Sequence, residues 1–388
     1  MTVTLVYNAR RSGPQTHVLA IGVGGYRHLP GYRNSPSSRQ RTMRDPLLYG
    51  NPKQLSSPPV SVLAVRDRVL ATDPGAWRAP LGTFELLIAP HPDNPWPAGN
   101  GVKFTEPTWR NIKQAFDRWY RRCDSPGNVA IFYFCGHGLE GDEQYVLASD
   151  FGGDDLSPWH NAIAIDSTIK GLWHCKAETQ CVFIDACRGV TAATQSTPRI
   201  DARALATYSD DNPTYVKYPL EIKAVARTEQ AFGKLGEVSY FTEVLLQALL
   251  GAAAEEEDGT GAWVVTTGSV ASNFYDVLEQ VAPNRAGTPS PRAGRPAILY
   301  RPPIPPVVRL AVGCEPVAAL GSARLSYRHQ TKPKKADKRG PASEVWNVDV
   351  EAGYYYVAAS FDQRDLYHDG EESVLARPPR YCRNVKVF

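Results

Sequence analysis

Short runs of consecutive apolar residues recur along residues 1–300, and most of them end in a glycine-rich or polar turn. Runs of this length with β-branched side chains are typical of strands buried on both faces of a parallel sheet. Because helical patterns separate several of these runs, we expect an α/β domain with a mostly parallel central sheet flanked by helices. The predicted strands are His17–Gly22, Thr83–Ala89, Asn128–Phe134, Cys181–Ile184, Leu220–Ala226 and Gly294–Tyr300.

Apolar residues at helical spacing mark the segments between these strands. The clearest pattern runs from Trp109 to Tyr120, after Thr105 and Pro107, which are typical helix start signals. An aromatic stripe of this kind is more typical of core packing than of a binding surface. Residues 31–59 are rich in Pro, Ser, Asn and Arg and predict a long loop. The expected helices cover about residues 60–72, 109–120, 163–173, 241–250 and 270–281.

The chain changes character after residue 300. Arg301–Pro306 is dominated by proline and predicts a stiff, extended linker. Short alternating runs broken by turns follow and are typical of a small β-sandwich. We therefore expect a main domain over residues 1–300, a linker over 301–306 and an accessory, all-β, sandwich-like domain over 307–388. The predicted strands of the accessory domain are Val307–Val312, Ala323–Tyr327, Ser343–Val350, Tyr354–Phe361 and Asn384–Phe388.

Composition excludes several classes of protein. The net charge of +3 over 388 residues is too small to predict nucleic-acid binding. The amino terminus lacks the pattern of a secretory signal, and the most apolar helical stretch, Val244–Ala254, is too short to span a bilayer. The seven cysteines stand at irregular spacing, which is not typical of a disulfide framework. We expect a cytoplasmic protein with reduced thiols that binds neither nucleic acid nor membranes.

Two of the predicted strands end at residues that can carry out chemistry. Cys187 follows the apolar run at 181–184, and His137 stands between Gly136 and Gly138 after the strand at 128–134. Open α/β sheets place their reactive groups at the carboxyl ends of strands. Asp185 and Cys187 are two positions apart, so an extended chain directs both to the same side. This predicts a carboxylate beside a nucleophilic thiol, an arrangement that favours a positively charged substrate group.

The sequence Asp-Ala-Cys-Arg-Gly at 185–189, with a histidine 50 residues upstream of its cysteine, resembles the signature of the caspase and metacaspase cysteine peptidases. The aspartate replaces the caspase glutamine and is similar to the metacaspase branch. The resemblance covers about residues 17–300 and includes the glycine-rich turn before Tyr26. It implies a caspase-like three-layer sandwich. The short acidic motif that metacaspases carry before the first helix has no counterpart in residues 31–59.

The resemblance also implies roles for individual residues. Cys187 would be the nucleophile and His137 its acid–base partner, while the backbone amides of Gly138 and Cys187 would form the oxyanion hole. Asp185 would read the P1 residue of the substrate, with Cys135 and Gln230 beside it in the same pocket. Because a buried carboxylate favours a cationic partner, we expect cleavage after arginine or lysine.

The long segment at 190–217 follows the expected nucleophile directly. A structureless segment of this length is usually functional, and its position matches the linker that caspases cut during maturation. It contains Arg199 and Arg203, which are of the residue type that Asp185 should accept. We therefore expect a latent enzyme that acts on protein or peptide substrates and is activated by self-cleavage here or by a partner protein.

An acidic, glycine-rich stretch follows His137. It is either a solvated loop with a strand near Tyr145 or a calcium site, since calcium prefers several carboxylate oxygens. No cofactor is expected to be required, with calcium as the exception to test. The candidate calcium ligands are Asp142, Asp150, Asp154 and Asp155.

Two other functions remain open. The chain would be a catalytically inactive caspase-like scaffold if the dyad did not work, or a separase-like or gingipain-like peptidase of the same clan. The complete pair of motifs around His137 and Cys187 argues against the scaffold. A metal site at His174, Cys175 and Cys181 is disfavoured because paired Cys-x-x-Cys spacing is missing.

Overall fold

The computed structural model describes residues 4–9, 11–32, 43, 45–93, 104–154, 156–197, 200–224, 235–257, 259–283, 289–363 and 365–387. The chain divides into two compact units. The first contains Met1–Leu246 and Leu278–Ala297, and the second contains Gln247–Val277 and Ile298–Phe388. Residues 247–277, which we expected within the main domain, therefore group with the carboxyl-terminal part of the chain.

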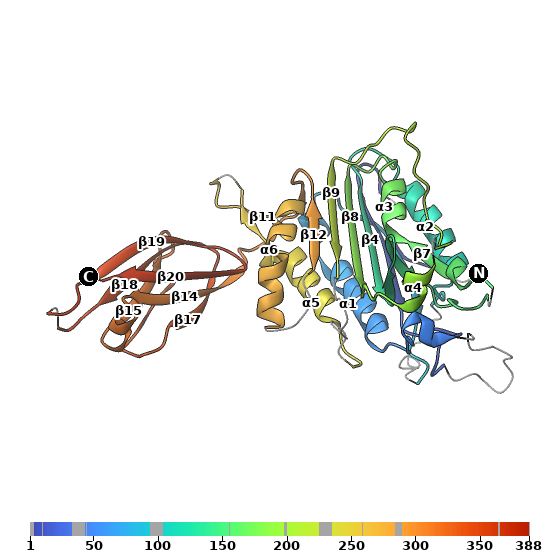
Figure 1. Cartoon of the computed structure of the whole chain (residues 1–388). Coiled ribbons are helices and arrows are strands. Elements are labelled where there is room, and N and C mark those ends of the chain that lie inside the picture. Colours follow the sequence, from blue (N-terminus) through green and yellow to red (C-terminus); the bar gives the residue numbers. More distant parts are fainter. Residues whose placement is uncertain are drawn as a thin grey trace. The chain divides into compact units, whose positions relative to one another are not determined.

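A seven-stranded sheet forms the centre of the first unit, in the order β1-β3-β2-β4-β8-β9-β12 (Figure 1). The five inner strands are parallel, and the two edge strands pair antiparallel to their neighbours. The predicted mostly parallel sheet is confirmed. The strands are β1 (Leu5–Asn8), β2 (Thr16–Val23), β3 (Leu81–Ala89), β4 (Val129–Gly136), β8 (Thr179–Ala186), β9 (Tyr218–Lys223) and β12 (Ser290–Ala293).

Helices cover both faces of this sheet, with α1 and α5 on one side and α2 and α3 on the other (Figure 1). A small antiparallel sheet, β5-β6-β7, follows β4 in the chain. The helices are α1 (Ser57–Ala71), α2 (Trp109–Cys123), α3 (Ile165–Leu172), α4 (Ala192–Ser196) and α5 (Tyr240–Gln247). The small sheet contains β5 (Gly138–Glu140), β6 (Gln144–Leu147) and β7 (Ala162–Ala164).

The aromatic stripe of α2 packs into the core, as its spacing predicts. Phe116 and Trp119 are buried and contact Phe132 of β4, with ring centroids 6.1 Å apart in both pairs. The Trp119 indole N–H donates a hydrogen bond to the His17 carbonyl at 3.0 Å, so the ring is satisfied although it is buried. Thr108 caps the helix by accepting from the Asn111 amide. These contacts hold α2 against β2 and β4 on one face of the sheet.

Three sequence predictions for the first unit need correction. The strand expected at Gly294–Tyr300 does not close the main sheet, because β12 occupies that edge. Pro296 has no amide hydrogen, and the chain leaves the sheet before it. No strand was predicted before His17, yet β1 (Leu5–Asn8) pairs with the edge of β3. Within the long segment at 190–217, α4 forms and Arg203 bridges to Ile163 of β7.

The second unit contains two sheets that share one core. The sheet orders are β17-β14-β20 and β16-β15-β18-β19, and β14 pairs with β20 in parallel. Leu310 and Val312 of the first sheet and Leu325 and Val357 of the second are buried in this common core, as the sandwich prediction requires. The strands are β14 (Val307–Glu315), β15 (Arg324–His329), β16 (Ala336–Arg339), β17 (Trp346–Glu351), β18 (Gly353–Ser360), β19 (Gly370–Ala376) and β20 (Arg380–Lys386).

The hydrophobic pattern did not predict β16 or β19. All four β16 residues are exposed or half-buried, because this strand forms a sheet edge. The second unit also contains β10 (Glu255–Glu256) and β13 (Ile298–Tyr300), which both pair with β11 (Trp263–Thr266). The remaining long helix is α6 (Thr267–Val281). None of the helices in the described ranges is both long and apolar enough to cross a bilayer.

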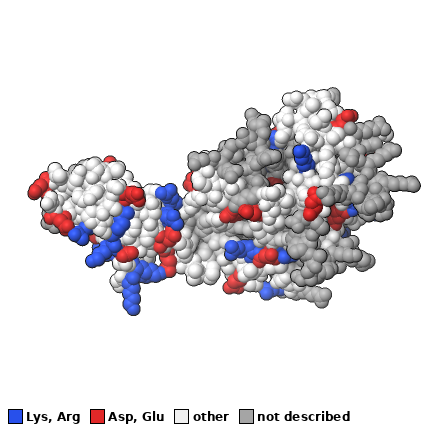
Figure 2. All heavy atoms as spheres, turned by 90° about the horizontal axis from the view of Figure 1, so that it is seen from below, with Lys and Arg blue, Asp and Glu red and all other residues white. Residues whose placement is uncertain are grey.

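Charged side chains on the β-sandwich are paired rather than gathered by sign. Figure 2 shows basic and acidic atoms interspersed over the side of the sandwich that it presents. Arg309 contacts Asp349 at 2.6 Å, and Arg324 contacts Asp362 at 2.8 Å. Exposed pairs of this kind add little stability, typically about 0–1 kcal/mol each. Their consequence here is that neither sign dominates the surface drawn.

Candidate active site

The pairing of β4 with β8 brings the two predicted catalytic residues to neighbouring strand ends. These parallel strands pair with Cys135 opposite Asp185 and Gly136 opposite Ala186. His137 and Cys187 are the next residues of the two strands, so both leave the sheet at its carboxyl edge. Cys187 is half-buried, whereas Cys135 is buried within the sheet. Of these two cysteines, Cys187 is therefore the accessible one, and it follows the strand that adjoins the histidine strand.

The His137 imidazole is held on two sides. Its Nε2 lies 2.5 Å from the Lys53 carbonyl oxygen. Its ring packs against Tyr26 with centroids 4.9 Å apart, and its backbone amide donates to the Tyr26 hydroxyl at 2.7 Å. Because a carbonyl can only accept, Nε2 carries the proton and Nδ1 keeps a lone pair. Burial lowers the pKa of His137, and the bond to Lys53 opposes this only in part, so the ring is a neutral base.

Gly138 lies so close to the cysteine loop that no larger residue fits. A Cβ atom at this position would stand 2.4 Å from the Cys187 carbonyl oxygen and 3.0 Å from the Ala186 Cβ. The two loops continue side by side, because the Glu140 amide donates to the Gly189 carbonyl at 2.9 Å. This close approach is the physical reason for glycine after the histidine. The proposed oxyanion amides of Gly138 and Cys187 lie in these adjoining loops.

Asp185 is buried at the end of β8, with an exposed fraction of 6 %. One carboxylate oxygen accepts from the Cys135 thiol at 3.1 Å, from the Thr242 hydroxyl at 2.8 Å and from the Ser239 hydroxyl. Burial raises the pKa of Asp185, and these three donors, together with Tyr133, lower it only in part. Burial also raises the pKa of Cys135, and the nearby Asp185 charge raises it further, so the Cys135 thiol keeps its proton. Within the described residues, no lysine or arginine forms an ion pair with Asp185.

Sequence reasoning missed Ser239, Thr242 and the Lys53 carbonyl. Ser239 stands immediately before the apolar helix α5, where serine is a common cap, so a local signal existed for it. Its hydroxyl accepts from the Thr242 amide at 3.1 Å as a cap does, and it also donates to Asp185. Lys53 contributes only its backbone carbonyl, and no side-chain pattern reports such a role.

The predicted residues of the 190–217 segment and of the substrate pocket are only partly described. Gln230 and Arg199 lie outside the described residues. The Arg203 guanidinium lies 3.5 Å above the Trp109 ring and donates to the His160 carbonyl at 2.7 Å. Its backbone carbonyl accepts from the Ala164 amide at 3.2 Å. Cleavage at Arg203 would therefore require these contacts to open first.

The carboxylates considered for calcium have separate partners. Asp142 accepts from the Tyr145 hydroxyl, and Asp150 accepts from the Trp109 amide at 2.9 Å. Asp154 accepts from the backbone amides of two residues that follow it, at 3.0 and 3.2 Å. Asp155 lies outside the described residues. In the described ranges no three His, Cys, Asp or Glu side chains gather as a metal site would require, so calcium binding stays an untested prediction.

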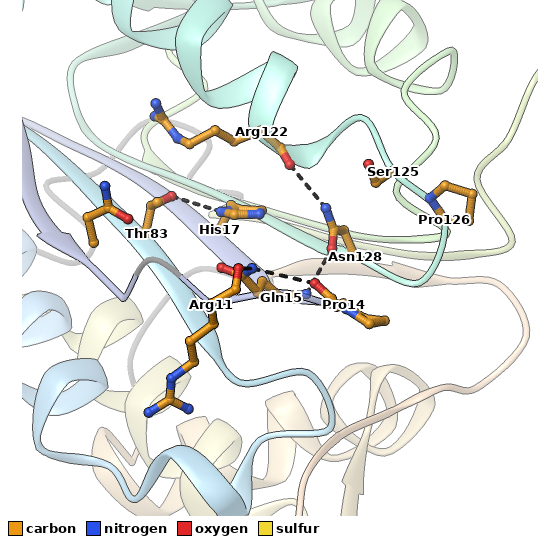
Figure 3. Close-up of a pocket in the computed structure, with 11 residues that line it drawn as sticks. Arg11, Pro14, Gln15, His17, Thr83, Arg122, Ser125, Pro126 and Asn128 are labelled. Atoms are coloured by element: carbon orange, nitrogen blue, oxygen red, sulfur yellow. Dashed lines mark hydrogen bonds between the residues drawn. The ribbon is translucent and has the colours of Figure 1, made fainter.

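A cavity of about 540 Å³ opens at the other end of the sheet, near the amino ends of β2 and β4 (Figure 3). Its polar lining groups are largely bonded to one another or to the protein. His17 pairs with Thr83 at 2.9 Å, and Asn128 donates to the Arg122 carbonyl at 3.0 Å and accepts from the Gln15 amide at 2.8 Å. Because this cavity lies at the amino ends of the strands, it is separate from His137 and Cys187, which lie at the carboxyl ends.

Substituting Gly138 tests whether this close approach shapes the site. We expect Gly138→Ala to displace the Cys187 loop and slow alkylation of Cys187 by iodoacetamide about 100-fold, because small misplacements of reacting groups have effects of that size. Gly189→Ala is the matched control, since a Cβ at Gly189 meets nothing within 4 Å. Equal alkylation rates for Gly138→Ala and Gly189→Ala would contradict the conclusion that the close approach of Gly138 shapes the site.

Comparison with known proteins agrees with this geometry. The family model described as the caspase domain of peptidase C14 matches residues 89–289, just over half of the chain. Uncharacterized protein y4kE of Sinorhizobium fredii is 29% identical over 207 residues, covering 53% of this chain and 59% of that protein. A probable protease of a Desulfuromonadales bacterium is 30% identical over 133 residues, covering 33% of this chain and 15% of that protein. The chain thus spans less than two thirds of either relative.

Among solved structures, protein GSU0716 from Geobacter sulfurreducens superposes with a TM-score of 0.39 at 12% identity, covering 75% of this chain and 98% of that one. The family match includes His137, Asp185 and Cys187 together with the strands that carry them. The chain belongs to the caspase-domain family of peptidases.

Proposed function

We propose that this protein is a cysteine endopeptidase in which Cys187 and His137 form the catalytic dyad. The observation that carries the proposal is the register of β4 and β8, which places the two residues at adjacent strand ends. The bond from His137 Nε2 to the Lys53 carbonyl supports it, because this bond leaves Nδ1 as the proton acceptor. Membership of a peptidase family supports the reaction class.

The reaction follows from these groups. His137 takes the proton of the Cys187 thiol, and the thiolate attacks the carbonyl carbon of the substrate peptide. The electron pair of the carbonyl moves to oxygen, which the backbone amides of Gly138 and Cys187 stabilise. The imidazolium then gives its proton to the leaving amine as the C–N bond breaks, which leaves a thioester. Water, deprotonated by His137, hydrolyses the thioester and regenerates the thiol.

The proposed substrate preference is arginine or lysine at P1. Asp185 supports this preference because its carboxylate is buried two residues before the nucleophile and has neutral hydrogen-bond donors as its partners. A buried carboxylate of this kind gains most from a cation and strongly disfavours a second anion. The caspase preference for an acidic P1 residue would therefore be reversed.

We further propose that the enzyme is latent and cuts itself within residues 190–217. This segment leaves the Cys187 loop and returns to β9, so it begins and ends beside the nucleophile's strand. Arg203 is held by Trp109 and His160. Arg199 is therefore the better candidate of the two, although activation by a partner protein or by calcium would also explain latency.

Two competing functions are distinguished by measurement. An inactive caspase-like scaffold would show no turnover and no enhanced reactivity of Cys187. A separase-like or gingipain-like peptidase would share the basic P1 preference, so a cleavage-site profile on an unbiased peptide mixture is needed to compare the positions beyond P1.

Cys187→Ala is expected to lower kcat/KM on arginine-P1 peptides at least about 10⁴-fold without unfolding the protein, because the thiol is the nucleophile. His137→Ala should have nearly the same effect, since the pair acts as one unit. The melting temperature of each variant is the control for folding, and Cys382→Ala, an exposed cysteine of the second unit, is the matched variant. Wild-type turnover by purified Cys187→Ala would refute the dyad.

Asp185→Asn is expected to remove the preference for a charged P1 side chain. Matched peptides with arginine or its neutral isostere citrulline at P1 measure this directly. We expect kcat/KM on arginine to fall about 100-fold, since truncating one partner of a buried charge pair costs about 2–5 kcal/mol, while citrulline is little affected. Burial raises the pKa of Asp185, so its charged form disfavours folding at neutral pH. Asp185→Asn removes this charge and should therefore melt no earlier than the wild type. Cleavage after aspartate by the wild type would contradict the charge argument.

Self-processing is tested by intact-mass analysis of the active wild type beside Cys187→Ala. We expect fragments with new ends between Val190 and Lys217 in the wild type alone, because Cys187→Ala cannot cut. Arg199→Gln should prevent that cut, while Arg203→Gln serves as the matched comparison. A fully active, uncut wild-type chain would dispose of the idea and leave the dyad proposal intact.

A further inference from the structure

A short segment at 53–55 lies along the turn that follows β2. The Leu55 amide donates to the Gly24 carbonyl at 2.8 Å. The side chain of Gln54 accepts from the Tyr26 amide at 2.7 Å and donates to the Tyr26 carbonyl at 3.1 Å. A Cβ atom at Gly24 would stand 2.5 Å from the Leu55 carbonyl oxygen, so glycine allows this approach.

The Gln54 amide makes more contacts than one loop attachment requires. Its nitrogen also lies 3.1 Å from the Pro30 carbonyl and 3.3 Å from the Leu29 carbonyl. One side-chain oxygen thus faces an amide donor, and one side-chain nitrogen faces three carbonyl acceptors. This pattern fixes which end of the amide is oxygen, because the reverse orientation would place like groups together. This position therefore requires a side chain of the length of glutamine that carries both a donor and an acceptor.

Both segments joined by Gln54 contact the catalytic histidine. On one side, the Tyr26 hydroxyl accepts from the His137 amide at 2.7 Å, and its ring packs against the imidazole. On the other, the carbonyl of Lys53, the residue before Gln54, holds His137 Nε2 at 2.5 Å. The imidazole therefore lies between two groups whose separation depends on the Gln54 side chain.

We propose that Gln54 is a positioning residue for the reaction: it ties the Lys53 carbonyl to the Tyr26 turn and so keeps His137 in the tautomer with its proton on Nε2. This inference rests on the proposed function of His137 and deepens it. Gln54 does not act on the substrate itself. Its effect on the reaction passes through the orientation of the imidazole, and small errors in that orientation slow proton transfer.

Gln54→Met is the decisive variant, because methionine has similar length and volume but cannot form these hydrogen bonds. We expect kcat on arginine-P1 peptides to fall about 10- to 100-fold, with KM changed less than about twofold, since Gln54 is proposed to act on the imidazole rather than on the substrate. Gln114→Met, an exposed glutamine on α2, is the matched control. Gln54→Asn keeps the amide but shortens it by one methylene, so its kcat should lie between those of wild type and Gln54→Met.

The second measurement does not depend on turnover. In full-length protein labelled with ¹⁵N-histidine, the His137 signal is identified by its loss in His137→Ala. We expect the wild type to show a single tautomer protonated on Nε2, and Gln54→Met to show exchange between tautomers. Wild-type kcat together with an unchanged His137 tautomer in Gln54→Met would overturn the proposal. If the wild type had no activity, the proposed function would fail, and the tautomer comparison would still decide the role of Gln54.

Discussion

The site depends on one constraint above all: the parallel register between β4 and β8. Because Cys135 pairs with Asp185, β4 and β8 end side by side, directly before His137 and Cys187. A shift by one residue would turn every side chain of one strand to the opposite face. His137 and Cys187 would then no longer leave the sheet together. The buried residues along both strands resist such a shift, because each face packs against its own layer of helices.

The same register explains why the Asp185 carboxylate costs stability. Asp185 faces Cys135 across the strand pair and meets Thr242 of α5 and Ser239, which precedes that helix. These donors satisfy its hydrogen-bonding capacity but supply no positive charge, and burial still raises its pKa. A group held in this way stabilises the fold most when it is protonated, and that stability is lost as the pH rises through its raised pKa. The arrangement is unfavourable for folding alone and favourable for receiving a cation.

Prediction from sequence succeeded where local pattern determines the structure. The apolar runs located the inner strands, and the aromatic spacing of α2 identified the residues that pack on Phe132. It failed where the determining contact is distant or made by the backbone. Nothing near Gly294 shows that residues 290–293 take the sheet edge. The Lys53 carbonyl could belong to any residue type, and its role depends on a contact 84 positions away along the chain.

Other charges near the site are committed to holding its loops. Arg188, the residue after Cys187, forms a two-pronged pair with Glu140 of β5. Lys223 at the end of β9 pairs with Asp166 of α3. Burial raises the pKa of Asp166, but Lys223, together with the Gln144 amide and the Arg188 charge, outweighs it and leaves the pKa lowered. These pairs tie the ends of β8 and β9 to the elements that follow His137. Each of these carboxylates has a cation, whereas the partners of Asp185 in the described part of the chain are all neutral. Under the proposed preference, a cationic P1 side chain would supply the countercharge.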